Sequence, residues 1–149
     1  MPIGEICTRE VVVASRDTSV LEAAQLMRQH HVGALVVADA TDGKRKPVGL
    51  ITDRDLVVEV MAPQVNPTSI TVGDIMLQEL SSIQENSGVF EAVQFMRAKG
   101  VRRLPVVDKQ GWLIGIVSMD DLLALLAEEM NEMAGVISHE QSKETHTRH

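Results

Sequence analysis

Hydrophobic positions recur in the same order twice along this chain. A shift of 69 residues carries VLEAAQLMR at 20–28 onto VFEAVQFMR at 89–97, and every paired position is identical or hydrophobic in both. Within each segment the apolar residues recur at the three- and four-residue spacing of an amphipathic helix. Such self-similarity is typical of a chain built from two copies of one structural unit.

Each copy predicts the same order of elements: strand, helix, strand, strand, helix. A short turn opens each copy at 4–7 and 73–76, and β-rich runs follow at 11–14 and 80–84. The amphipathic helices are predicted at 19–30 and 88–99. Strand pairs are predicted at 34–38 and 48–52 and at 104–107 and 113–118. The closing helices are predicted to begin at Asp53 and Met119.

One copy supplies about 60 residues, which is too few for a comfortable hydrophobic core. We therefore expect an α/β protein of the α+β type, in which two β-α-β-β-α repeats pack as one pseudo-twofold module. The predicted boundaries are 1–62 for repeat 1, 63–71 for the linker, 72–133 for repeat 2 and 134–149 for a polar, disordered tail. The first copy is three residues longer, within the polar stretch 41–46, which is typical of a surface hairpin loop.

The closing helix of the second copy is apolar over more than one stripe. Its apolar residues are Leu122, Leu123, Leu125, Leu126 and Met130. A helix with so wide an apolar arc must bury two sides. One side can face its own sheet. The other is covered either by a second copy of the chain, giving a homodimer, or by the first repeat.

Two predicted strand-to-helix junctions carry residues suited to binding chemistry. Residues 49–55 read GLITDRD and 115–121 read GIVSMDD, so each has a glycine, a hydroxyl residue and, three positions later, an aspartate. A helix N-terminus presents free N–H groups that favour an anion. The hydroxyls of Thr52 and Ser118 can hydrogen-bond a phosphate or ribose oxygen. Asp55 and Asp121 can each accept two hydrogen bonds from a ribose diol.

The same residues also suit a purely structural role. A Thr or Ser followed three residues later by an acidic residue forms a helix cap that satisfies backbone amides without any ligand. Taken alone, either segment is more often a cap than a ligand site. The spacing therefore leaves both interpretations open.

The endings of the two copies, together with RRLPVVD at 102–108, mark a known family. From residue 3 to residue 130 the chain resembles the tandem CBS (cystathionine-β-synthase) domain pair, or Bateman module. The resemblance implies a β-α-β-β-α fold in each copy and two clefts between the paired sheets. It also implies ligands such as AMP, ADP, ATP, S-adenosylmethionine or NAD, and frequent disc-like dimers.

The resemblance also implies roles for individual residues. Ribose and phosphate contacts are implied for Thr52, Asp55, Ser118 and Asp121, phosphate contacts for Arg102 and Arg103, and an adenine slot for Val12, Ser81 and Gly33. Adjacent arginines suit phosphate because each offers a planar fork of donors. The first copy departs from this pattern, with Gly33 and Ala34 at the positions of the two arginines and Val36 at that of Pro105. The two clefts should therefore differ.

Composition narrows the possible functions. The net charge of −7 disfavours binding to nucleic acid, and an aromatic content of 2% leaves too few rings to stack on exposed bases. The single cysteine, Cys7, cannot form an intrachain disulfide and is interpreted as a packing residue, so no metal site is expected. No apolar run approaches the length of a membrane helix, and we expect a cytoplasmic protein that does not bind membranes.

No phosphate-binding loop, dinucleotide glycine motif or nucleophile elbow occurs in the sequence. We therefore expect no enzyme and no required cofactor. The predicted function is a regulatory module that binds AMP, ADP or ATP, with S-adenosylmethionine or NAD as further possibilities, and acts in trans on a partner protein. The alternatives are a structural dimerisation module with empty clefts and a small enzyme that acts on a nucleotide.

Overall fold

The computed structural model describes residues 1–76 and 80–147, which fall into two units. The first unit, Met1–Val117, contains both sheets apart from the last residue of strand β6. The second unit begins at Ser118 and contains one long helix, α6 (Met119–Thr147).

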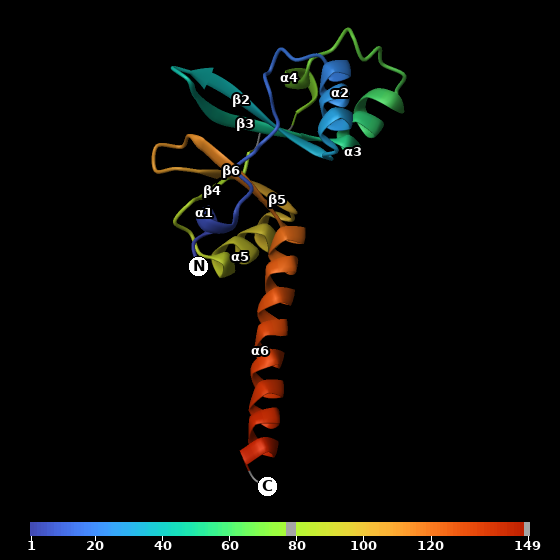
Figure 1. The fold of residues 1–149 in the computed structure, drawn as a ribbon. Helices are drawn as coiled ribbons and strands as arrows, with labels where there is room; N and C mark the ends of the chain where they lie inside the picture. Colours follow the sequence, from blue (N-terminus) through green and yellow to red (C-terminus); the bar gives the residue numbers. More distant parts are fainter. Residues whose placement is uncertain (77–79, 148–149) are drawn as a thin grey trace. The chain divides into compact units, whose positions relative to one another are not determined.

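Each repeat builds one three-stranded sheet, in the orders β1-β2-β3 and β4-β5-β6 (Figure 1). The elements of the first repeat are α1 (Ile3–Ile6), β1 (Val13–Ala14), α2 (Val20–His30), β2 (Ala34–Thr41), β3 (Lys44–Thr52), α3 (Asp53–Leu56) and the π-helix η1 (Val57–Met61). Those of the second are α4 (Val72–Ile75), β4 (Ile83–Gln84), α5 (Val89–Lys99), β5 (Arg103–Val107) and β6 (Leu113–Ser118). In both sheets the first strand runs parallel to the second, and β3 is antiparallel to β2. The predicted mixed α/β fold is confirmed.

Local sequence determines where helix α2 begins, which face it buries and where it ends. The Ser19 hydroxyl accepts a hydrogen bond from the Glu22 N–H at 3.1 Å and caps the first turn. Val20, Ala23 and Met27 form the buried face. The helix ends at His31, whose φ of 54° is left-handed, and α5 ends in the same way at Gly100, where φ is 68°. His31 and Gly100 are matched by the 69-residue shift, so both copies use the same helix stop.

The hairpin between β2 and β3 takes up the three extra residues of the first copy. The two strands extend to Thr41 and from Lys44, so the stretch predicted as a loop is mostly strand. Only Asp42 and Gly43 form the turn, with φ of 51° and 77°. Positive φ at both central residues is the geometry that joins two twisted strands tightly, and an Asp-Gly pair favours it.

The segment that opens the first repeat packs against the second repeat. In α1, the N–H of Ile3 donates to the Ser87 carbonyl at 2.7 Å and the N–H of Gly4 donates to the Glu85 carbonyl at 2.8 Å. A Cβ at Gly4 would lie 2.9 Å from the Glu85 Cβ, so the glycine permits this approach. The opening segment of the first repeat is therefore held by backbone hydrogen bonds to the second repeat.

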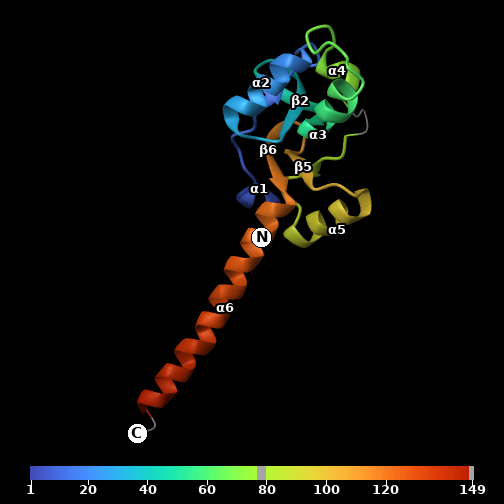
Figure 2. The ribbon, with the colours of Figure 1, turned by 90° about the vertical axis from the view of Figure 1, so that its right-hand side faces the viewer.

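The segment that opens the second repeat packs against the first. In α4, the N–H of Val72 donates to the Thr18 carbonyl at 2.8 Å and the N–H of Gly73 donates to the Arg16 carbonyl at 2.9 Å. Both views show α4 beside α2 rather than beside α5 (Figure 1 and Figure 2). The buried core of the first repeat consequently includes two residues from this segment, and its members are Ala14, Ala23, Met27, Leu35, Val37, Ile51, Val72 and Met76.

Helix α6 continues as one helix through Thr147. The sequence predicts a disordered tail at 134–149, and the structure corrects this for residues 134–147. The stretch after Gly135 is polar, but it contains no proline and is rich in residues that favour helices, among them Glu140, Gln141, Lys143 and Glu144. Polarity was the wrong signal for disorder here, because a polar sequence of helix formers can still be helical. The last two residues lie outside the described part of the chain.

Candidate functional site

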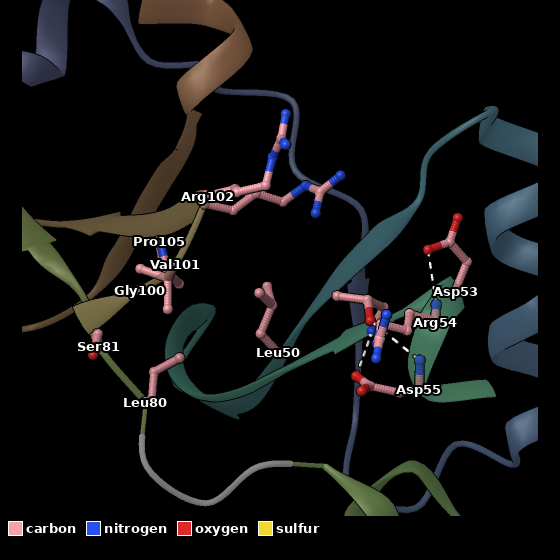
Figure 3. Close-up of a pocket in the computed structure, with 12 residues that line it drawn as sticks. Leu50, Asp53, Arg54, Asp55, Leu80, Ser81, Gly100, Val101, Arg102 and Pro105 are labelled. Carbon is pink, nitrogen blue, oxygen red and sulfur yellow. Dashed lines mark hydrogen bonds between the residues drawn. The ribbon is translucent and has the colours of Figure 1, made fainter. Parts of the chain in front are cut away.

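A cavity of about 430 Å³ lies within the first unit, and we call it the Thr52 cavity. Its lining residues are Leu50, Thr52, Asp53, Arg54, Asp55, Leu80, Ser81, Gly100, Val101, Arg102, Arg103 and Pro105. They come from the β3–α3 junction of the first repeat and from the segments before β4 and around β5 in the second. Figure 3 shows Ser81, Leu80 and Val101 on one side, and Arg54 and Asp55 on the other.

Thr52 and Asp55 form a reciprocal helix cap beside this cavity. The N–H of Thr52 donates to Asp55 Oδ2 at 2.9 Å, and the N–H of Asp55 donates to Thr52 Oγ1 at 3.3 Å. The helix cap that the sequence allows at this motif is therefore present. The cap leaves binding capacity, because an ionised carboxylate has about four acceptor positions and a hydroxyl keeps its own proton to donate. Both side chains are half-buried and line the cavity.

Ser118 and Asp121 form the matching cap in the second unit. The N–H of Ser118 donates to Asp121 Oδ2 at 3.3 Å, and the N–H of Asp121 donates to Ser118 Oγ at 3.1 Å. The two copies of the motif therefore share one local structure. Helix α6 begins directly after this cap, as the sequence predicts.

Three guanidinium groups line the Thr52 cavity. Arg103 is the first residue of β5, Arg102 directly precedes that strand, and Arg54 comes from the first turn of α3. Against them stand the carboxylates of Asp53 and Asp55, so the described lining residues carry a net positive charge in a chain whose net charge is −7. A local positive field in an acidic protein favours a small anion over a large polyanion, because the rest of the surface repels the latter.

Asp53 and Arg54 also line the cavity, although neither was predicted as a site residue from the sequence. They occupy the two variable positions between the hydroxyl and the aspartate of the motif, and so carried no pattern of their own. The Asp53 carboxylate accepts from the N–H of Arg54 at 2.8 Å. The helical turn that follows Thr52 places Arg54 at the cavity, and no pattern in the sequence shows which way that position points.

The predicted residues are not all in one place. The structure brings Thr52, Asp55, Ser81, Arg102 and Arg103 together around the cavity. Gly33 lies instead against Asp53, whose N–H donates to the Gly33 carbonyl at 2.9 Å. Val12 lines a separate cavity of about 480 Å³ in the first unit, formed by Glu10, Val11, Val12, Val13, Leu26, His30 and Val32.

Cys7 is held in a packing environment. A Cβ at Gly115 would lie 2.7 Å from the Cys7 Sγ, so the thiol fills the space above that glycine. Burial raises the pKa of the Cys7 thiol, which keeps it protonated and weakly nucleophilic near neutral pH. Among the described residues, no group of three or more His, Cys, Asp and Glu side chains could hold a metal ion. Within the same residues, no helix is both long and apolar enough to cross a bilayer.

Comparison with known proteins agrees with this architecture. The family model for the CBS domain matches residues 3–62 and 72–128. A protein of Methanopyrus kandleri is 40% identical over 137 residues, covering 87% of this chain and 68% of its own. The CBS domain-containing protein YhcV of Bacillus subtilis is 36% identical over 133 residues, covering 89% of each chain.

The fold is also shared with a solved structure. The CBS domain pair of protein MJ0100, in complex with 5'-methylthioadenosine and S-adenosylmethionine, superimposes with a TM-score of 0.75 at 24% identity, covering 87% of this chain and 98% of that one. The chain therefore belongs to the CBS domain family and carries two CBS domains in tandem. The resemblance found in the sequence is confirmed.

Proposed function

We propose that this chain is a regulatory module that binds an adenine nucleotide, AMP, ADP or ATP, in the Thr52 cavity. The observation that carries the proposal is the convergence of three arginines and the Thr52–Asp55 pair on one cavity built from both repeats. Its volume of about 430 Å³ falls within the range of small-molecule sites.

Each part of a nucleotide has a suitable counterpart in the lining. The guanidinium groups of Arg54, Arg102 and Arg103 offer charge-assisted hydrogen bonds to phosphate oxygens. The open acceptor positions of Asp55 suit a ribose diol. Apolar side chains for the base come from Leu50, Leu80, Val101 and Pro105, and Ser81 adds a polar contact.

The charge of the described lining residues favours some adenosyl ligands over others. S-adenosylmethionine carries a positive sulfonium group and no phosphate, so three arginines oppose it. NAD carries a pyrophosphate and remains a competitor. The related fold of MJ0100 accommodates adenosyl ligands without phosphate. We infer that the arginines of this chain shift its preference towards phosphorylated adenosine.

The competing function is a structural module whose cavities stay empty. The capping role of all four Thr, Ser and Asp residues favours it, because these residues have a use without ligand. The adjoining cavity and its arginines favour binding, since a cap needs neither. Conversion of a nucleotide by the chain is the third possibility, and product analysis after long incubation tests it.

A thermal-shift panel with AMP, ADP, ATP, NAD and S-adenosylmethionine separates these functions. A ligand at 100 times its Kd adds about 2.7 kcal/mol to the free energy of unfolding. We expect a rise in Tm with at least one adenine nucleotide, lost in Arg103→Ala and kept in Arg97→Ala. Arg97 is the matched control because it is an exposed arginine of α5 that does not line the cavity. No response to any of the five ligands would leave the structural module as the better explanation.

We further propose that the module acts in trans on a partner protein, through a coupling free energy of about 1–3 kcal/mol between ligand and partner. We also propose a homodimer, supported by the exposed apolar side chains of its helices. Light scattering after size-exclusion chromatography measures the molar mass, and a monomer at micromolar concentration would contradict the dimer.

A further inference from the structure

Helix α6 extends well past the part of the chain that the family shares. The helix has 29 residues, whereas the match to the CBS domain ends at residue 128. The remaining part, through Thr147, is helical and carries large apolar side chains that are exposed. These are Met130, Met133, Val136 and Ile137, and the exposed residues Leu123 and Leu126 precede them.

Four of these residues fall on one line along the helix. Leu126, Met130, Met133 and Ile137 follow one another at spacings of four, three and four, and their side chains are 54%, 61%, 66% and 58% exposed. An alternation of three and four residues is the seam of two paired helices, because it keeps the apolar edge facing the partner. Leu123, three residues before Leu126, continues the same line. We call these five residues the α6 stripe.

We propose that the α6 stripe pairs with the α6 stripe of a second copy of this chain, with the two helices antiparallel. The inference deepens the proposed homodimer by assigning its interface, and it is independent of what the Thr52 cavity binds.

The spacings of four, three and four residues between Leu126, Met130, Met133 and Ile137 are symmetric, which is what pairing of identical antiparallel helices requires. When Met130 of one copy lies opposite Met133 of the second, Leu126 lies opposite Ile137 and Leu123 lies opposite Glu140 at the end of the seam, and the same contacts recur with the copies exchanged. Ala127 and Ala134 flank the seam on one side. Their small side chains let the two backbones approach closely.

The area of the stripe is sufficient for a specific contact. Each of the five side chains removes roughly 100 Å² from water when it is covered. The pair of stripes then buries about 1,000 Å² in total, which is the lower limit for a biological interface. Two copies of the chain can therefore cover each other's α6 stripes, and no other partner is needed for an interface of this size.

Charge selects the antiparallel orientation. The half of α6 at 119–132 holds Asp120, Asp121, Glu128, Glu129 and Glu132 and no Lys or Arg. The half at 133–147 holds Glu140, Glu144 and Lys143. Parallel helices would align the two strongly acidic halves with each other. Antiparallel helices place each beside a nearly neutral half, and also oppose the two helix dipoles.

A charge placed on the seam tests the interface. Met130→Glu is expected to halve the molar mass measured by light scattering, whereas Asn131→Glu, which adds the same charge at the next position, outside the seam, is expected to leave it unchanged. The Tm response to nucleotide should persist in both variants, so a failure here is separable from a failure of the nucleotide site. A Met130→Glu chain that remains as associated as Asn131→Glu would overturn the inference while leaving a homodimer through another face.

Cross-linking tests the orientation directly. In a Cys7→Ala background, the single-cysteine variants Leu126→Cys and Ile137→Cys are mixed and oxidised. Antiparallel stripes predict the disulfide between the two different variants in excess of either symmetric one. Predominance of the two symmetric disulfides would refute the antiparallel register, and the absence of any intermolecular disulfide would refute the pairing itself.

Discussion

Substituting Gly73 by alanine tests the exchange of opening segments that brings the two repeats together. Gly73 lies in α4, and its N–H donates to the Arg16 carbonyl of the first repeat at 2.9 Å. An added Cβ would lie 2.9 Å from that carbonyl oxygen and 3.3 Å from the Arg16 Cβ. The oxygen belongs to the backbone, so it cannot move aside as a flexible side chain would.

The expected cost follows from two opposed terms. Inserting a methyl group into a closely packed contact costs about 1–3 kcal/mol. Alanine in place of glycine within a helix returns up to about 1 kcal/mol. We therefore expect Gly73→Ala to lower the free energy of unfolding by about 1–2 kcal/mol. Gly4→Ala should have a similar effect, because its Cβ would lie 2.9 Å from the Glu85 Cβ and 3.1 Å from the Glu85 carbonyl oxygen.

Urea unfolding followed by tryptophan fluorescence measures this effect, since Trp112 is the single tryptophan and lies in the first unit. Gly135→Ala is the control. It is the same substitution within α6, and an added Cβ there would meet nothing within 4 Å. Circular dichroism of that variant should show α6 melting at a higher temperature, with a gain of about 1 kcal/mol.

The sign of the change in the free energy of unfolding tests the exchange of opening segments. If Gly73→Ala is at least as stable as the unchanged chain, the contact with Arg16 does not hold α4 in place, and the exchange of segments is refuted. A loss in Gly73→Ala without one in Gly4→Ala would show that only the second opening segment is locked to the opposite repeat.

Three further predictions concern helix ends and the thiol. Because His31 has a left-handed φ, His31→Gly should stabilise the fold by about 0.5–1 kcal/mol and Gly100→Ala should destabilise it by about 1 kcal/mol, as measured by urea unfolding. Asp55→Ala should lose about 1 kcal/mol with the cap, whereas Asp55→Asn, which keeps an acceptor for the Thr52 N–H, should retain most of the stability; equal losses would contradict this role. Since burial raises the pKa of Cys7, iodoacetamide should alkylate the folded protein at pH 7.5 more slowly than the urea-unfolded protein, and the stability contributed by the neutral thiol should fall as the pH rises through that pKa.

Internal repetition made most of the fold predictable. The 69-residue shift located both amphipathic helices, and the structure places them at Val20–His30 and Val89–Lys99. The closing helices begin at Asp53 and Met119, as predicted. These elements are set by local periodicity and by caps, which a single sequence displays.

The exchange of opening segments could not be predicted in the same way. Gly4 and Gly73 occupy equivalent positions, so either segment could pack on its own repeat or on the other one. The choice depends on contacts with Glu85 and Arg16, which lie far away in the sequence. Tertiary packing decides which repeat each opening segment contacts, and local sequence patterns carry no information about that packing.

The candidate site was predictable in its chemistry and less so in its membership. Arg102 and Arg103 were visible as a pair, but Arg54 was not, because nothing in the sequence shows which way a variable position of a helical turn points. Gly33 and Val12 were expected in an adenine slot, and neither lines the Thr52 cavity: Gly33 lies against Asp53, and Val12 lines the separate cavity of about 480 Å³. The loss of the arginine pair in the first repeat fits this asymmetry between the copies.

Capping and binding are compatible roles for Thr52 and Asp55. The cap fixes both side chains through hydrogen bonds to the backbone, at 2.9 Å and 3.3 Å, so neither must lose conformational freedom when a ligand arrives. The side chains of Thr52 and Asp55 line the same cavity as Arg54, Arg102 and Arg103. A cap alone explains the hydrogen bonds but not the presence of three guanidinium groups in the lining of that cavity. Binding of a phosphorylated ligand explains both, and it therefore accounts for more of the observed arrangement than the structural role does.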